Sequence, residues 1–168
     1  ADIKIRKNII QDILRPNQLE DDSFDVISIF QTIDHMENPN EILSICNRAL
    51  KKNRLILIIS HDVESFSSKF LGEKSPIFDI EHTQLFSKKT ISKILEKNRF
   101  QILEIVNLSN TYALEYWIKL SPLPKIMKFF LKKILDFLGL SSREITIKPG
   151  NFGIIAHKTI SIALGKIE

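Results

Sequence analysis

Polar side chains gather just after an apolar run in the first quarter of the chain. Residues 24–36 read FDVISIFQTIDHM, with an aromatic ring, an amide, a carboxylate and an imidazole at Phe30, Gln31, Asp34 and His35. Open parallel sheets bind ligands at the carboxyl ends of their buried strands. His35 could act there as a base, or it could pack under the turn and hydrogen-bond to the backbone. The spacing therefore predicts a ligand-binding crest around residue 30.

A second histidine could reach that crest from a distant part of the sequence. His82 closes a long connection over 61–86, and such connections in compact domains are usually lids or binding loops. A neutral imidazole near pH 7 suits either a base or a substrate contact. His61, just after a predicted strand, could line the same cleft, but a solvated loop residue is the favoured interpretation. We expect His157 to be structural and Asp25 to hydrogen-bond to the local backbone.

Helix and strand signals alternate around these residues. Asn38, Pro39 and Glu41 form a helix start, with an N-cap side chain, a proline in the first turn and an acid three residues past the cap. Ser87 is a second candidate N-cap. Apolar spacing predicts helices over 39–51 and 87–97, and strands over 3–13, 24–30, 54–60, 100–108, 144–148 and 152–158, with a turn at 149–151 between the last two.

This alternation predicts an α/β fold with right-handed crossovers and a mostly parallel sheet, three layers deep; the resemblance described below implies that the sheet is Rossmann-like. Its continuous apolar runs are typical of strands that are covered on both faces. The last two segments predict an antiparallel final strand at one edge of the sheet. A length of 168 residues fits one domain.

The composition argues against several classes of protein. A net charge of +4 without a dense Arg/Lys stripe argues against a nucleic-acid partner. The single cysteine, Cys46, lies on the apolar stripe of the 39–51 helix, so we expect a buried thiol and no disulfide within the chain. No signal peptide is visible, and no uncharged run approaches the roughly 20 residues of a membrane span. We therefore expect a cytoplasmic protein.

The region 112–142 forms a separate excursion that contains a helical stretch over 124–140. On a helical wheel its lysines form a narrow strip beside a broad apolar face. This helix could make a peripheral membrane contact or cap an apolar substrate, or it could pack on the sheet or on a partner subunit. Tyr112, Tyr116 and Trp117 suit a hydrophobic substrate pocket as well as a core.

Two longer strings of residues match a known family in order and spacing. They are DDSFDVISIFQTIDHMENP at 21–39 and HTQLFSKKTISKILEKNRFQI at 82–102, and the late FGIIAHK at 152–158 is similar to that family's last strand. The chain resembles class I S-adenosylmethionine-dependent methyltransferases over most of 9–158. It looks most like the small-molecule branch that includes the ubiquinone-type O-methyltransferases.

The resemblance implies a role in cofactor binding for four residues. Asp12 would hydrogen-bond the adenine amino group of S-adenosylmethionine, with Ile13 beside the ring. Phe30 would pack on the cofactor, and Gln31 would face the methyl-transfer cleft. An adenine ring and a sulfonium need an acceptor, apolar cover and a mostly dry cleft.

The resemblance also implies methyl transfer to an oxygen or a nitrogen of a small acceptor that could be lipophilic. His82 and His35 are the candidate catalytic residues for removing the acceptor's proton. The domain would occupy 1–158 as a partial methyltransferase domain, with a helical insertion at about 112–142 and a tail at 159–168.

The chain also departs from the family pattern. It contains no G-x-G, the turn with which the family cradles the methionyl end of the cofactor. Ubiquinone-type members carry E-x-x-E-H at the crest, thought to hold a divalent cation. Here the corresponding residues are Gln31, Asp34 and His35, so an amide replaces one of the two carboxylates. A hard cation prefers charged oxygen ligands, so we predict no metal.

Because the glycine-rich turn is missing, we expect this polypeptide to be the C-terminal two-thirds of a methyltransferase. An alternative is a non-catalytic methyltransferase-like interaction subunit that uses its basic apolar helix for a partner or a membrane. A third interpretation is the rear half of another nucleotide-binding doubly wound domain. The oligomeric state stays open.

Overall fold

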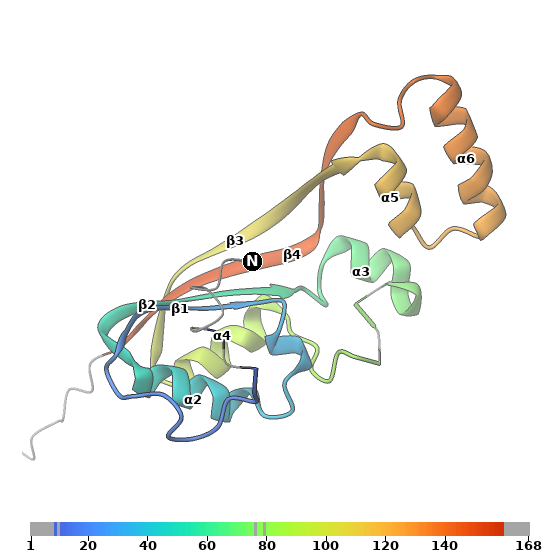
Figure 1. Cartoon of the computed structure of the whole chain (residues 1–168). Helices are drawn as coiled ribbons and strands as arrows, with labels where there is room; N and C mark the ends of the chain where they lie inside the picture. Colours follow the sequence, from blue (N-terminus) through green and yellow to red (C-terminus); the bar gives the residue numbers. More distant parts are fainter. Residues whose placement is uncertain (1–8, 10, 76, 79, 160–168) are drawn as a thin grey trace, which may run out of the picture.

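A four-stranded sheet organises the protein, as seen in a computed structural model that describes residues 9, 11–75, 77–78 and 80–159. The strand order is β1–β2–β4–β3 (Figure 1). β1 and β2 are parallel, and β4 is antiparallel to both of its neighbours, so β1, β2 and β3 run in the same direction. The strands are β1 (Phe24–Phe30), β2 (Leu50–His61), β3 (Phe100–Ala113) and β4 (Glu144–Lys158).

The predicted α/β sheet is confirmed, but the prediction for its last strand is wrong in two respects. β4 lies inside the sheet, between β2 and β3, and not at an edge. It is also one continuous strand, where the sequence predicted two strands and a turn. The Pro149-Gly150 signal marks a bulge: Leu108 pairs with Asn151 and Asn110 with Ile147, so three residues of β4 face a single residue of β3.

Two helices begin at the predicted caps. In α2 (Pro39–Ala49) the Asn38 side chain accepts a hydrogen bond from the Glu41 backbone N–H at 3.3 Å. In α4 (Lys88–Lys97) Ser87 and Thr90 form a reciprocal capping box. Both helices lie on the same side of the sheet (Figure 1).

The core forms between these two helices and one face of the sheet. Cys46 is only 2% exposed, so the predicted buried thiol is confirmed. On the opposite face Val26, Phe30 and Leu55 remain exposed, so the predicted third layer is not observed in the described part of the chain. The fully buried core residues from the sheet and the helices are Leu43, Leu50, Ile56, Ile58, Ile91, Leu95, Phe152, Ile154 and Ala156, with Ile33 beside them.

The predicted strand over 3–13 falls largely outside the described residues, which exclude 1–8 and 10. Residues 9 and 11–13 are not in a strand, so Asp12 does not close a strand in the part that the structure describes. Of the predicted tail at 159–168, only Thr159 is described; its backbone N–H donates to the Arg99 carbonyl at 3.0 Å.

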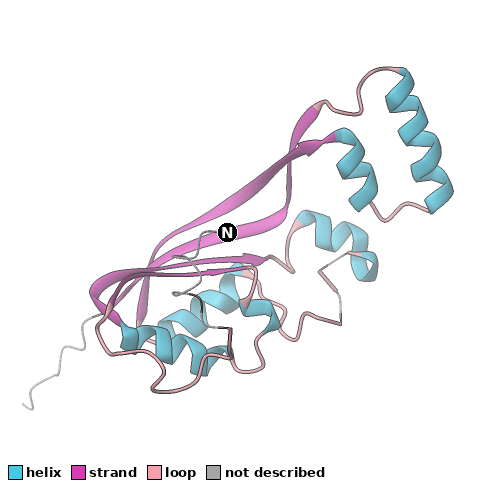
Figure 2. Ribbon diagram, in the orientation of Figure 1, coloured by secondary structure: helices cyan, strands magenta, loops and turns pink. Residues whose placement is uncertain are grey.

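Beyond the shared sheet, β3 and β4 continue alone as a two-stranded ribbon. The β2–β4 ladder ends at His61–Asn151, whereas the β3–β4 ladder continues to Ala113–Glu144. At about 3.3 Å per residue, the seven extra residues of β4 carry the ribbon roughly 20 Å past the end of β2. Residues 114–143, here called the arm, close this ribbon with α5 (Leu114–Leu120) and α6 (Lys125–Phe137) (Figure 1, Figure 2).

The connection between β2 and α4 contains only short helical segments. They are α3 (Phe66–Leu71) and η2 (Gly72–Lys74), while η1 (Ile33–His35) follows β1. Within the described ranges no helix is both long enough and apolar enough to cross a membrane.

Candidate functional site

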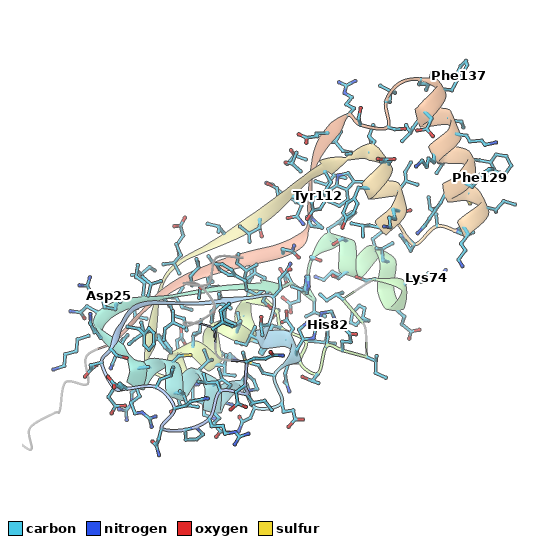
Figure 3. The ribbon with its side chains drawn as sticks, in the orientation of Figure 1. Asp25, Lys74, His82, Tyr112, Phe129 and Phe137 are labelled. Atoms are coloured by element: carbon cyan, nitrogen blue, oxygen red, sulfur yellow. The ribbon has the colours of Figure 1, made fainter. Side chains whose placement is uncertain are left out.

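Three histidines from distant parts of the sequence meet at the carboxyl ends of β1 and β2. His35 ends η1, His61 is the last residue of β2, and His82 comes from the returning connection. The ring centroid of His82 lies 4.6 Å from that of His35 and 5.3 Å from that of His61. Figure 3 marks His82 at this end of the sheet. The prediction of His61 as a solvated loop residue is therefore wrong.

Hydrogen bonds hold the returning connection against η1 and so place His82. The Gln84 backbone N–H donates to the Asp34 carbonyl at 3.0 Å. The Nδ1 of His35 lies 2.7 Å from the Glu81 carbonyl oxygen. Because a carbonyl can only accept, this Nδ1 carries the proton, and the Nε2 of a neutral His35 ring is left as an acceptor.

Two buried polar atoms beside the histidines have no hydrogen-bond partner among the residues that the structure describes. Asp34 is 2% exposed, and its Oδ1 accepts a hydrogen bond from the Ser60 hydroxyl at 2.6 Å, while its Oδ2 has none. The Nδ1 of His82 is the other such atom. Unpaired buried polar groups destabilise the folded state, so these two atoms, on segments that meet at the histidine cluster, mark a functional candidate. His61 is oriented separately, by Asn151 Oδ1 at 2.7 Å.

The two predicted cofactor residues at the end of β1 are at the same crest. Phe30 is 52% exposed on the uncovered face of the sheet. Gln31 has φ = 46°, and its backbone N–H still donates to the Ile59 carbonyl of β2 at 2.8 Å. A positive φ at a residue other than glycine is uncommon, and such residues cluster at functional sites.

The two predicted cofactor residues before β1 lie at the surface. The Asp12 Oδ1 accepts from the Ile13 backbone N–H at 2.8 Å and lies 3.6 Å from the Arg15 guanidinium. Ile13 is strongly exposed. Within the described residues, the polar contacts of Asp12 are with its sequence neighbours and not with the crest.

The remaining candidates lie elsewhere. Asp25 pairs with Lys51 Nζ at 2.7 Å and with Arg54 Nε at 3.1 Å, so the predicted backbone role is wrong. The hydrogen bond from Lys51 is the main reason that the pKa of Asp25 is lowered. His157 contacts Gln101 of β3 at 3.1 Å, at the opposite end of the β2–β4 ladder from Asn151.

No three His, Cys, Asp or Glu side chains in the described ranges are arranged to hold a metal ion. Two open cavities in the described part of the chain lie away from the clustered histidines. One lies between α5 and α6, and the other is a basic cavity of about 460 Å³ lined by Arg48, Lys97, Arg99 and Lys158 among others.

The sequence pointed to His35 and His82, but not to Ser60 as the partner of Asp34 or to Asn151 as the partner of His61. Ser60 and His61 end an apolar run, and this was the available signal, because parallel strands end at the same edge of a sheet. Asn151 could not be assigned without the position of β4.

Comparison with protein families shows which family the chain belongs to. A family model described as a methyltransferase domain matches residues 3–105, which include β1, β2, α4 and all three clustered histidines. The chain belongs to this methyltransferase family.

Solved structures show the same fold, that of class I S-adenosylmethionine-dependent methyltransferases. A proposed methyltransferase from Bacillus halodurans is 18% identical at a TM-score of 0.56, over 85% of this chain and 73% of that one. An S-adenosylmethionine-dependent methyltransferase from Thermotoga maritima is 20% identical at 0.54, over 84% and 59%. The YcgJ protein of Bacillus subtilis is 20% identical at 0.53, over 85% and 67%. No curated protein matches the sequence.

Proposed function

We propose that this methyltransferase domain transfers a methyl group to an oxygen or a nitrogen of a small acceptor at the crest of β1 and β2. The observation that supports this most is the meeting of His35, His61 and His82 beside buried Asp34. Methyl transfer is an in-line displacement, so the protein chiefly aligns the reactants and removes a proton where the acceptor carries one.

S-adenosylmethionine, when bound, supplies the electrophilic methyl group. The residues at the crest suit its adenosyl half: exposed Phe30 offers apolar cover for a ring, and Gln31 lies next to it. Asp12 and Ile13 would complete the adenine site. The chain has no G-x-G to bind the methionyl end, so we expect these 168 residues alone to bind the cofactor weakly.

His82 and His35 are the proposed proton acceptors. The contact of His35 Nδ1 with Glu81 fixes its ring orientation and leaves Nε2 free to accept a proton when the ring is neutral. His82 lies against both other imidazoles. General-base catalysis of this kind contributes about 100-fold or more to a rate.

A titration with S-adenosylhomocysteine, followed by backbone amide NMR and by calorimetry, tests the cofactor site. We expect no micromolar binding, but at millimolar ligand we expect shifts at Asp12, Ile13, Phe30 and Gln31 that weaken in Phe30→Ser. Arg48→Gln, in the basic cavity, is the control and should change nothing. Shifts confined to that cavity, or none at any concentration, would refute the site; micromolar binding would refute the expected weakness.

The proposed base is tested by substitution of the histidines. In any preparation with measurable methyl transfer, His82→Gln or His35→Gln should lower kcat by about 100-fold and flatten its pH profile. His157→Gln, at the far end of β4, is the matched control. Equal rates for all three variants would remove the histidines from the mechanism.

A second candidate function is a non-catalytic methyltransferase-like interaction subunit. The absence of G-x-G from the sequence and the exposed apolar residues of α6 favour it. The same NMR titration separates the two candidates, because an interaction subunit would show no shifts at the crest with S-adenosylhomocysteine.

A further inference from the structure

The outward face of α6 is apolar and open to solvent. None of the helix residues is buried, and Phe137 at its end is 90% exposed (Figure 3). At 100° per residue, six exposed apolar side chains occupy about a third of the helix circumference. Lys128, Leu131 and Leu135 are half-buried. The six exposed residues, here called the α6 apolar face, are Ile126, Met127, Phe130, Ile134, Phe137 and Leu138.

The net positive charge of the chain is concentrated in the arm. Residues 114–143 contain six Lys and Arg against two acids, a net charge of +4. The whole chain also has a net charge of +4, with 24 basic and 20 acidic residues, so the remainder is neutral. One of the two acids, Glu115, is paired with Lys132 at 3.2 Å.

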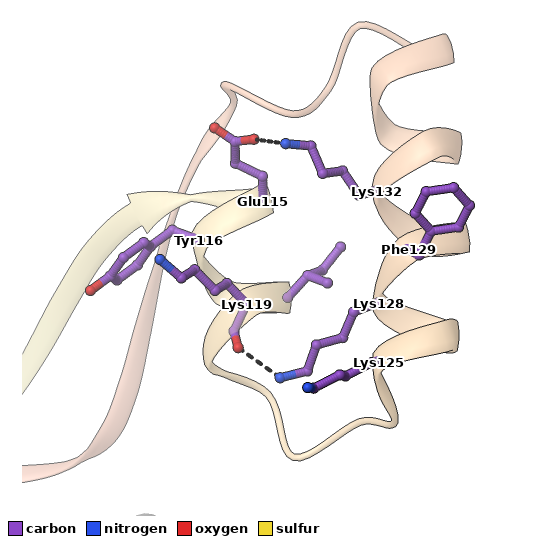
Figure 4. A pocket seen from close by; sticks show the side chains of 8 residues that line it. Glu115, Tyr116, Lys119, Lys125, Lys128, Phe129 and Lys132 are labelled. Carbon is purple, nitrogen blue, oxygen red and sulfur yellow. Dashed lines mark hydrogen bonds and ion pairs between the residues drawn. The ribbon is translucent and has the colours of Figure 1, made fainter.

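A basic cavity lies between α5 and α6, on the other side of α6 from the α6 apolar face. It measures about 510 Å³ and is lined by four lysines and one acid, Glu115, together with Tyr116, Ile118 and Phe129 (Figure 4). The Lys128 ammonium donates to the Lys119 carbonyl at 2.7 Å, and the Lys133 ammonium lies 4.7 Å from the Phe129 ring centroid. The lining lysines are Lys119, Lys125, Lys128 and Lys132.

We infer that the arm binds the surface of an anionic phospholipid membrane, with α6 lying in the interfacial plane. Lipid phosphates would contact the lysines while the α6 apolar face enters the acyl boundary, which is how basic amphipathic helices bind bilayers. The positive charge of the arm favours an anionic membrane over a second copy of the chain. A second copy would bring one arm of +4 against another, and repulsion disfavours that contact.

The position of the arm adds a geometric reason. β1, β2 and β3 run in the same direction, and the arm follows the carboxyl end of β3, so it extends from the same end of the sheet as the histidine cluster. A membrane bound by the arm would therefore lie beyond the same end of the sheet as the crest. The inference concerns binding alone and does not depend on methyl transfer.

Vesicle co-sedimentation of the full chain tests it. We expect binding to vesicles with about 30 mol% phosphatidylglycerol, little binding to pure phosphatidylcholine, and a strong decrease when salt is raised from about 0.1 M to 1 M. Phe130→Ser with Phe137→Ser should lower the partition coefficient at least about tenfold. The matched control is Phe66→Ser with Phe70→Ser, two strongly exposed phenylalanines of α3.

A second pair of variants tests the charge. Lys125→Glu with Lys133→Glu in the arm should abolish the preference for anionic vesicles, while Lys89→Glu with Lys93→Glu, exposed on α4, should leave it unchanged. Circular dichroism checks that each variant is folded.

Three outcomes would overturn the inference. The first is unchanged binding in the Phe130/Phe137 variant, and the second is loss of binding only in the Phe66/Phe70 control. The third is a chain that dimerises through the α6 apolar face, or binds inorganic phosphate, without binding vesicles.

Discussion

The body of the protein buries its apolar helix residues, whereas the arm exposes residues of the same kinds. In α4, Ile91 and Leu95 are fully buried against the sheet, whereas in α6 Ile134 is 53% exposed and no residue is buried. Both helices are amphipathic, and helical periodicity alone cannot distinguish them. What differs is the surface opposite each helix: α4 has the sheet, while α6 has only the short helix α5.

The body and the arm also differ in how their helices begin and in their net charge. α4 begins at a capping box, but α6 begins after Pro124 with no side-chain cap. The body has equal numbers of acidic and basic residues outside 114–143, whereas the arm carries the net +4. We conclude that the body is built for internal packing and the arm for an external surface.

The largest effect is expected from the same substitution in the two helices. Ile91→Ala removes a fully buried side chain and should lower the free energy of unfolding by about 2–5 kcal/mol. Ile134→Ala, half exposed, should change it by less than about 0.5 kcal/mol. Urea unfolding measures both, and equal losses would mean that α6 is covered in solution.

The next effect comes from the cysteine of the body. Burial raises the pKa of the Cys46 thiol from 9.0 to about 11. Below pH 9 the thiol is protonated in both states; between pH 9 and 11 it ionises only when unfolded, so its contribution to stability is lost as pH rises. The loss should approach about 2–3 kcal/mol.

The measurement is the free energy of unfolding at pH 8 and pH 11 for the wild type and for Cys46→Ala. The wild type should lose more stability than the variant over this interval. Rapid reaction of the folded thiol with a disulfide reagent at pH 8 would show that the site is open.

Two glycines give a smaller contrast between the regions. Gly150 has φ = 105°, and a Cβ there would lie 2.7 Å from the Ser65 Cβ, whereas Gly139 after α6 has φ = 65° and open space around it. Gly139→Ala should cost about 1 kcal/mol for its backbone alone, and Gly150→Ala about 1 kcal/mol more. Thermal unfolding of both variants checks that Gly150→Ala is the more destabilising. A larger loss for Gly139→Ala would indicate that the arm packs on a partner.

The smallest effect is expected inside the arm. The Glu115–Lys132 pair is exposed on both sides, so Glu115→Gln should change the free energy of unfolding by less than about 1 kcal/mol. The same variant should strengthen vesicle binding, since it removes one of two acids from the arm. Weaker binding would indicate that the ion pair orders the basic cavity.

Local signals in the sequence predicted much of the body. β1 was predicted at its observed bounds, and α2 and α4 begin at the predicted caps. These signals were readable because capping and apolar spacing are local properties of the sequence. β2 and β3 are longer than predicted, since their polar ends continue the ladders with β1 and β4. The position of β4 between them depends on pairing between distant residues, which no local pattern carries.

The candidate site was predictable in part for the same reason. Parallel strands end together, so His35 could be assigned to the crest, and the proximity of His82 was a hypothesis that the structure now gives as 4.6 Å between ring centroids. The path of the connection before it was not predictable. The turn predicted at 149–151 was wrong because turns and bulges favour the same residues, here Pro149-Gly150. Only the pairing with the neighbouring strand distinguishes the two.

The bulge at Lys148–Gly150 also governs the aim of the arm. It lies where β4 leaves the support of β2, and both strands of the ribbon pass through it before the arm begins. A bulge bends the strand and increases its twist, so inserting or deleting one residue there would change the direction in which the ribbon carries α6. Homologues that differ by one residue at this position could thus present the same helix to a different surface, with no change in the helix or in the histidine cluster.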